Sequence, residues 1–177
     1  MSTKFSMLIA SVLTIVLGCV ETTSIEAPSE VNPNVSFELT VHTELTHAAN
    51  TSWGELAILI PEFWSVDSVF GDGYEYVGPL EFSGIGGWPA DLFPPSIGYV
   101  WWLFYCPELL YGDSAETGYA IATIITDDSI GTFQVASIAC ASVEKEPWFD
   151  GVPCSCTVDV TPLNLEQKTW GYIKAEF

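Results

Sequence analysis

Residues 35–43 read VSFELTVHT, and they contain the clearest strand signal in the chain. Apolar and polar side chains alternate here with a period of two, which is typical of a strand with one buried and one solvated face. The apolar phase contains Val35, Phe37, Leu39 and Val41, and the polar phase contains Ser36, Glu38, Thr40 and His42. The stretch therefore predicts a half-buried β-strand with His42 on its solvent side.

Further stretches of strand character follow, separated by turn residues. They are ELAILIP (55–61), FWSVDSVF (63–70), GYVWWLFYC (98–106), TGYAIATIIT (117–126), GTFQVASIACAS (131–142), CSCTVDVTP (154–162) and TWGYIKAEF (169–177). The run at 98–106 is apolar throughout, so we expect burial on both of its faces. Trp64, Trp101 and Trp102 lie in such stretches and are expected in the core.

This pattern gives about seven or eight short strands and no amphipathic helix. It predicts an all-β fold: a two-layer antiparallel β-sandwich of immunoglobulin-like type, with a jelly roll as the alternative. We assign residues 35–177 to this domain.

Three phrases support the same architecture by resemblance. LAILIPEFWSVDSV (56–69), YVWWLFY (99–105) and GTFQVASIA (131–139) resemble immunoglobulin-like modules of bacterial surface proteins, in which an aliphatic strand ends in Pro before Trp-x-Val. The Cys-Trp-Cys order of true immunoglobulin domains is missing, because Trp101 and Trp102 precede Cys106. The resemblance implies a fold, and folds of this kind serve many functions.

The chain begins with an export signal. Lys4 precedes an apolar run that ends at Gly18, which is too short for a membrane span and is followed by a polar stretch. The end of the run, VLGC at 16–19, resembles the lipobox of bacterial lipoproteins, although Leu17 occupies a place usually given to a smaller residue. The resemblance implies a signal peptide at 1–18 and diacylation of Cys19; the alternative is ordinary cleavage and secretion.

Residues 19–34 are rich in Glu, Thr, Ser and Pro and show no periodicity. We expect a flexible tether that holds the domain away from the membrane. The protein would then be anchored on the cell envelope through Cys19 and face the periplasm or the cell exterior.

The charge balance is strongly acidic. The chain has 23 Asp and Glu against four lysines and no arginine, which gives a net charge of −19. Nucleic-acid binding and a polybasic lipid site are excluded, because both need Lys and Arg. The acidity predicts a self-repelling surface or, alternatively, Ca²⁺ binding by loop oxygens; no other cofactor is expected.

Four cysteines remain downstream of Cys19, and an even number in an exported domain favours disulfides. The candidates are Cys106, Cys140, Cys154 and Cys156, with three possible connectivities. Direct pairing of Cys154 with Cys156 would close a strained loop, so we expect each to reach one of the other two. A four-thiolate metal site is the rival interpretation, although the spacing is not that of a zinc ribbon.

No motif predicts catalysis. His42 and His47 are the only histidines, and neither G-x-S-x-G nor H-E-x-x-H occurs. Asp127 and Asp128 precede a turn and are interpreted as turn residues. We therefore expect a protein that is not an enzyme.

The Gly- and Pro-rich loop at 71–96 offers the candidate ligand site, because exposed aromatic rings on a rigid scaffold can bind sugars. Its candidate residues are Trp88, Tyr74 and Tyr76, and the alternative is that the loop merely covers a sheet edge or the end of the core. The sequence thus predicts an adhesion, assembly or protein-interaction domain, with a carbohydrate-binding module as the alternative.

Overall fold

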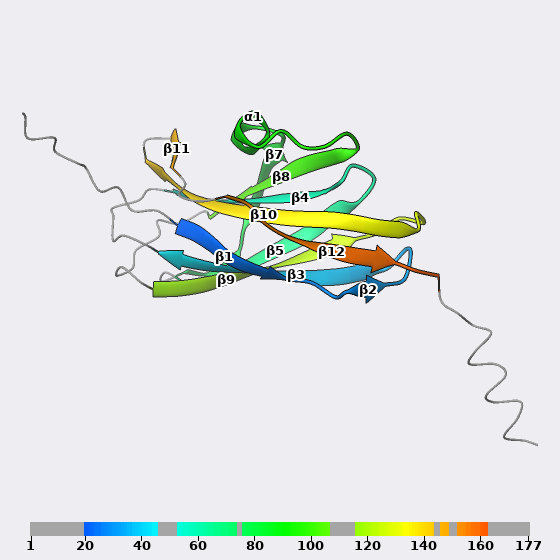
Figure 1. The fold of residues 1–177 in the computed structure, drawn as a ribbon. Coiled ribbons are helices and arrows are strands. Elements are labelled where there is room, and N and C mark those ends of the chain that lie inside the picture. The colour runs from blue at the N-terminus through cyan, green and yellow to red at the C-terminus, as the bar shows by residue number, and fades with distance from the viewer. Residues whose placement is uncertain are drawn as a thin grey trace, which may run out of the picture.

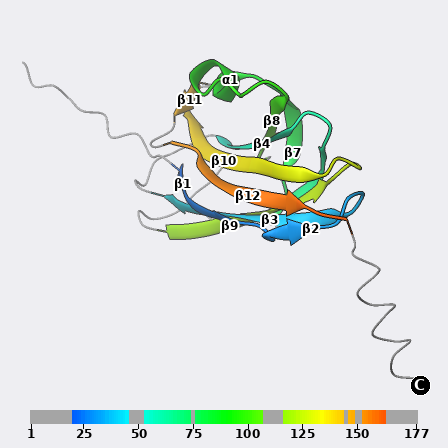
Figure 2. The same cartoon turned by 45° about the vertical axis from the view of Figure 1, so that its right-hand side comes forward.

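The computed structural model describes residues 20–45, 53–73, 76–106, 116–143, 146–148 and 152–162. Most of them belong to strands, and the strands form two sheets that pack face to face (Figures 1 and 2). The predicted all-β, two-layer sandwich of immunoglobulin-like type is confirmed.

Sheet A is the lower layer in Figure 1. Its strands pair antiparallel throughout, in the order β1-β3-β9-β5-β6. The strands are β1 (Val20–Glu26), β3 (Ser36–Leu45), β9 (Glu116–Ile125), β5 (Ser65–Gly73) and β6 (Tyr76–Pro79).

Sheet B has the order β2-β12-β10-β4-β8-β7, with β11 paired to β10 at one end, and it forms the upper layer in Figure 1 except at its β2 edge, which lies low in that view. Only its β2–β12 pair is parallel among the described strands. The strands are β2 (Glu30–Val31), β12 (Cys154–Val160), β10 (Gly131–Val143), β4 (Trp53–Pro61), β8 (Tyr99–Tyr105), β7 (Glu81–Ile85) and β11 (Glu146–Trp148).

The alternation predicted for 35–43 is observed in β3. Phe37, Leu39 and Val41 are buried between the sheets, whereas Glu38 and His42 point to the solvent side. Val35 lies just before the strand and is 37% exposed. The buried side chains therefore begin with Phe37, two residues later than the sequence predicted. Each fully buried aliphatic side chain of this kind contributes about 1.5–3 kcal/mol to folding.

Aromatic side chains fill the space between the sheets at one end of the core. Trp64 is 2% exposed, and its ring contacts those of Phe37 and Phe133 at centroid distances of 5.8 Å and 5.0 Å. This confirms the prediction of a core position for Trp64.

The outer face of sheet B is covered by the helix α1 (Trp88–Leu92) and the chain around it (Figure 1). Trp101 and Ile138 are buried under this segment, and Trp101 donates its indole hydrogen to the Phe93 carbonyl at 3.0 Å. Phe104, in the same strand as Trp101, is buried on the opposite face. The predicted burial of the 98–106 stretch on both faces is therefore confirmed.

The predicted tether at 19–34 is wrong for the residues that the structure describes. Val20 and Thr22 of β1 are 4% and 5% exposed, and β1 pairs with β3 along its length. The Ala139 amide donates to Thr22 Oγ1 at 2.8 Å, which ties β1 to sheet B as well. The segment is thus an integral strand that closes one side of the sandwich.

The strand order also corrects the disulfide prediction. Cys106 follows β8, and Cys154 and Cys156 lie on β12, three strands away in sheet B. With strands about 4.8 Å apart, that separation is about 14 Å, twice the Cα distance a disulfide tolerates. The structure therefore keeps Cys106 out of disulfide range of the β12 cysteines.

The pairings of Cys140 fail because of side-chain direction. Alternation along β10 places Cys140 on the outer face with Ile138, whereas Cys106, Cys154 and Cys156 face the space between the sheets. Burial raises the pKa of the Cys154 and Cys156 thiols, and the charge of Glu21 raises that of Cys154 further. Both thiols are therefore held in their protonated form at neutral pH.

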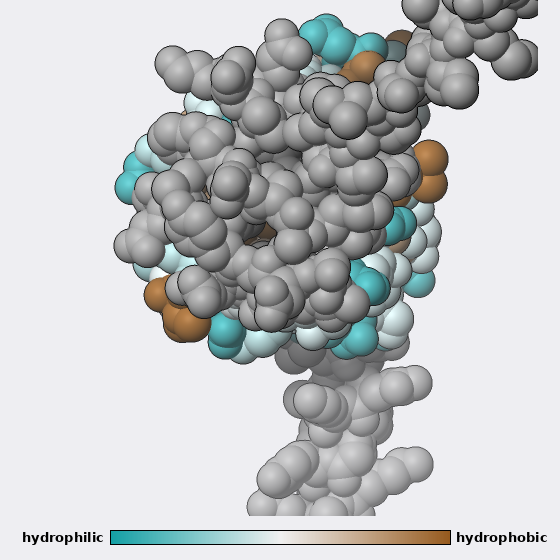
Figure 3. Space-filling model, turned by 90° about the vertical axis from the view of Figure 1, so that its left-hand side faces the viewer, coloured by the Kyte–Doolittle hydropathy of each residue, from teal (hydrophilic) through white to brown (hydrophobic). Residues whose placement is uncertain are grey.

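Within the described part of the chain, no helix has the length and hydrophobicity needed to cross a bilayer. Figure 3 views the sandwich from the left-hand end of Figure 1, where the described surface residues are mainly hydrophilic with scattered hydrophobic side chains between them. The signal peptide at 1–18, Cys19, His47, Tyr74 and the strand expected at 169–177 lie outside the described residues.

Candidate interaction surface

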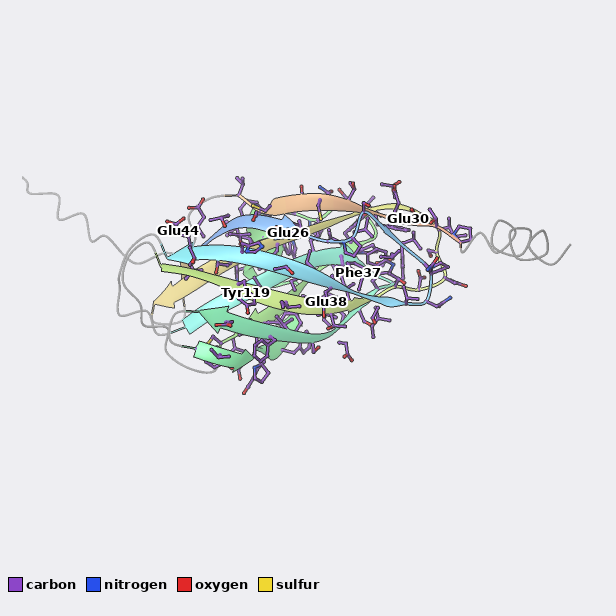
Figure 4. The ribbon with its side chains drawn as sticks, turned by 90° about the horizontal axis from the view of Figure 1, so that it is seen from below. Glu26, Glu30, Phe37, Glu38, Glu44 and Tyr119 are labelled. Atoms are coloured by element: carbon purple, nitrogen blue, oxygen red, sulfur yellow. The ribbon has the colours of Figure 1, made fainter. Side chains whose placement is uncertain are left out.

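The outer face of sheet A is uncovered in the part of the chain that the structure describes. Sheet B has α1 packed on its outer face, whereas no described helix or loop lies over the outer face of sheet A, which Figure 4 views directly. Glu26, Glu38, Glu44 and Tyr119 point from this face toward the viewer in that figure. We call this surface the open face.

Cross-strand pairing defines the rows of side chains on the open face. One row runs from Ser24 through His42, Tyr119 and Asp72 to Val77. The next row runs from Glu26 through Thr40, Ile121 and Phe70 to Pro79. Residues in one row are direct neighbours, about 4.5–5.5 Å apart at Cβ.

The half of the open face formed by β9, β5 and β6 is apolar, and we call this group of side chains the apolar centre. Phe70 is 43% exposed, Tyr119 and Ile125 are each 39% exposed, and Val77 is 68% exposed. Ile121 is half-buried between Phe70 and Thr40. Scattered apolar residues on a surface are ordinary, but a contiguous group on an uncovered sheet is typical of a binding surface.

The described carboxylates of the open face lie on β1, β3 and β5, beside the apolar group and, at Asp72, between two of its members. They are Glu21, Glu26, Glu38, Glu44, Asp67 and Asp72. His42 is the sole candidate cation on the face, with Nε2 3.5 Å from Glu26 Oε1. All four lysines lie outside the described residues, so nothing else in the described structure neutralises these charges.

Tyr119 and Asp72 form the most specific polar contact on the open face. The Tyr119 hydroxyl donates to Asp72 Oδ2 at 2.9 Å. This hydrogen bond and the carboxylate charge raise the pKa of Tyr119 above its ordinary value. A hollow of about 560 Å³ lies beside the pair and is lined by Thr23, Ser24, Glu26, His42, Thr43, Asp72, Gly73, Thr117, Gly118 and Tyr119.

The aromatic residues predicted to bind a ligand do not come together. Tyr76 is 9% exposed, packs in the core between the sheets and donates its hydroxyl to the Pro79 carbonyl at 2.6 Å. Trp88 is half-buried on the outer face of sheet B, where its indole hydrogen bonds to Glu55 Oε2 at 2.6 Å. Tyr76 is therefore not available to a ligand. The stretch predicted as a loop at 71–96 contains β6 at the edge of sheet A, β7 at the edge of sheet B, and α1, which packs on the outer face of sheet B.

Other candidate sites are also accounted for by structure. Asp127 accepts hydrogen bonds from the Ser129 amide and hydroxyl at 2.9 Å and 3.0 Å, which confirms its turn role. Among the described residues, no three His, Cys, Asp or Glu side chains cluster in a way that could hold a metal ion. A cavity of about 70 Å³ between the sheets, lined in part by Val20, Leu56 and Ala139, is smaller than the roughly 150 Å³ needed to hold benzene.

The sequence contained a signal for the open face. In TGYAIATIIT the solvent phase of the strand contains Tyr119, Ile121 and Ile125, where a simply solvated strand would carry polar residues. In the strand at 63–70 a register shift between Val66 and Ser68 moves Phe70 into the solvent phase. Strict alternation from Val66 would place Phe70 on the buried side, so the sequence pattern alone does not predict its exposure.

No protein-family model and no curated protein matches the chain. Solved structures with a similar fold include a cohesin module from a Clostridium perfringens family 33 glycoside hydrolase, at 13% identity and a TM-score of 0.47 over 81% of this chain and 98% of that chain. The collagen-binding domain of a Staphylococcus aureus adhesin is 13% identical, with a TM-score of 0.39 over 77% and 95% of the two chains. AvmM, which catalyzes macrocyclization in alchivemycin A biosynthesis, is 10% identical, with a TM-score of 0.48 over 80% and 90%.

Proposed function

We propose that the chain is an exported, lipid-anchored protein of the bacterial cell envelope, and that its β-sandwich is a non-catalytic domain for adhesion or assembly. The observation that supports the interaction role most directly is the open face. Its apolar centre is exposed on a rigid sheet, while the corresponding face of sheet B is covered by α1. Docking a partner would remove this apolar area from water.

The non-catalytic role rests on the polar groups of the described residues. His42 faces a solvated carboxylate and has no nucleophile beside it, and Asp127 is engaged in a turn. Tyr119 and Tyr105 each donate to a carboxylate, which raises the pKa of both hydroxyls, so both hydroxyls stay protonated at neutral pH. We therefore assign these side chains to hydrogen bonding with the chain or a partner and not to proton transfer.

The export and anchoring roles rest on the first 19 residues and on where β1 begins. Val20 is already buried in the sandwich, one residue after Cys19. An acylated Cys19 would therefore hold the domain directly at the membrane, with no intervening tether. Two or more acyl chains are needed for stable anchoring of this kind.

Metabolic labelling with a fatty-acid probe tests the anchor. We expect label on the full chain and its loss in Cys19→Ala, with retention in the control Cys154→Ala. Equal labelling of wild type and Cys19→Ala would contradict the lipoprotein role.

Photo-cross-linking in cells that naturally make the protein tests the interaction role. A photoreactive residue at Ser68, on the open face, should give a discrete cross-linked species, whereas one at Thr157, exposed on the outer side of β12, should not. The species should disappear when an excess of the unmodified protein competes. No cross-link from Ser68, or equal products from both positions, would contradict a docking role for the open face.

A further inference from the structure

We propose that the open face docks a basic protein segment, in which Lys or Arg side chains flank apolar side chains. This inference rests on the proposed interaction role and adds the site and the chemistry of the partner. Its two components are the exposed apolar centre, which would supply affinity, and the carboxylates beside it, which would select the charge of the partner.

The apolar component is a compact group on adjacent strands. Phe70 on β5 and Ile121 on β9 are direct cross-strand partners, and Pro79 on β6 pairs with Phe70 on its other side. Tyr119 and Val77 continue the group in the neighbouring row. A partner would bury this group with an apolar patch or strand of similar width, and few such central residues usually dominate binding.

The charged component borders that group directly. Asp72 pairs with Tyr119 and Val77, and Glu26 ends the row that contains Ile121 and Phe70. Glu38 lies in the next row, opposite Thr123. Among the described residues, only Glu26 has a candidate cation beside it, which is His42. Lys or Arg side chains of a partner would therefore meet carboxylates whose charge is otherwise not neutralised.

The same charges argue against other occupants. A second copy of the open face would place carboxylates against carboxylates, and anionic lipid or nucleic acid would be repelled in the same way. A sugar would stack on Phe70 or Tyr119, but it would leave the aliphatic side chains of Ile121, Ile125 and Val77 and the charge of the carboxylates without a matching partner. A basic protein segment satisfies both the apolar centre and the carboxylates beside it.

Selection of a displayed random-peptide library on the full chain in detergent tests this inference. We expect enriched peptides that contain Lys or Arg beside apolar residues. Their affinity should fall at least about tenfold in Phe70→Ser, a central apolar position. It should fall about two- to fivefold in Glu38→Gln, an exposed charge, and should weaken with added salt.

Matched variants separate the open face from general acidity. Glu62→Gln and Asp128→Asn each remove one exposed carboxylate from a turn away from this face, and we expect affinity unchanged in both. Equal losses in these controls and in Glu38→Gln would overturn the assigned site.

The outcomes also distinguish this inference from the proposed function. Enriched peptides that lack basic residues, or that bind Phe70→Ser as well as wild type, would overturn the inference and leave an interaction domain with another site. No enriched peptide together with glycan-array binding would overturn both, and would favour a carbohydrate-binding module.

Discussion

The hydrogen bond between Tyr119 and Asp72 on the open face depends on pH, because the Tyr119 hydroxyl can be deprotonated. This hydroxyl donates to Asp72 at 2.9 Å, and this hydrogen bond is the main reason that the pKa of Tyr119 lies above 10.0. Because the folded-state pKa is raised, the stability from this contact is fully present below the unfolded-state pKa and is lost as the pH rises through the folded value. The contact is therefore intact at neutral pH.

We predict that Asp72→Asn lowers the pKa of Tyr119 toward its ordinary value, because the carboxylate charge is removed. Ultraviolet difference titration of each protein against its Tyr119→Phe counterpart isolates this residue. Glu81→Gln is the control, since Glu81 raises the pKa of Tyr105 in the same way and should leave Tyr119 unchanged. An unchanged Tyr119 midpoint in Asp72→Asn would contradict the assigned cause.

Individual residues were predictable where strand alternation is regular. Phe37, Leu39 and His42 take the predicted sides of β3, and Trp64 takes its predicted place in the core. Tyr76 was not predictable, because the Gly-Asp-Gly stretch before it, which has the composition of a turn, belongs to β5, and the direction of Tyr76 depends on pairing with that strand. Short-range sequence patterns do not specify such pairing.

At the scale of elements, β1 is the main departure from the sequence-based expectation. Val20 and Thr22 point inward, but a register shift between Thr22 and Ser24 moves the next inward position to Ile25. This β-bulge interrupts the period-two pattern. The sequence of β1 therefore resembles that of a polar linker although the segment forms a strand. The disulfide prediction failed for a related reason, since strand order is not encoded in local periodicity.

We predict that Thr22→Val destabilises the fold by about 1–3 kcal/mol, because the buried Ala139 amide would lose its acceptor. Thr23→Val, on the exposed neighbouring residue, should change stability by less than about 0.5 kcal/mol. Chemical denaturation of both variants measures the difference. Equal effects would indicate that β1 does not brace sheet B.

Gly73, at the end of β5, provides a second test at this scale. Its φ is +139°, and a Cβ there would lie 2.6 Å from Gly118 Cα on β9. Gly84 has a φ of +156° but no described atom within 4 Å of such a Cβ. We therefore expect Gly73→Ala to cost about 1–3 kcal/mol more than Gly84→Ala in denaturation, because only Gly73 would clash with backbone.

At the scale of the whole molecule, the net charge of −19 opposes compaction. Raising the ionic strength shortens the Debye length from about 30 Å at 0.01 M to about 8 Å at 0.15 M. We predict that the melting temperature rises over this range, and rises less in Glu38→Gln/Glu44→Gln, where two carboxylates of the open face are absent. A melting temperature independent of salt would contradict strong self-repulsion.

Salt should act in opposite directions on folding and on docking. Screening relieves repulsion between the carboxylates of the folded protein, but it weakens their attraction for a basic partner. The overall architecture was predictable from eight strand-like stretches, whereas the open face was not, because it depends on which sheet α1 covers. That choice is made by packing of Trp88 and Phe93 against sheet B.

The central claim is that a basic segment docks on the open face of sheet A. Methyl NMR of the isoleucine-labelled protein, titrated with a peptide selected from the library, tests it most directly. The prediction is that the methyl signals of Ile121 and Ile125 shift, while those of Ile85 and Ile97, which are 57% and 103% exposed but lie outside sheet A, do not. Shifts at Ile85 or Ile97 without shifts at Ile121 would contradict the claim.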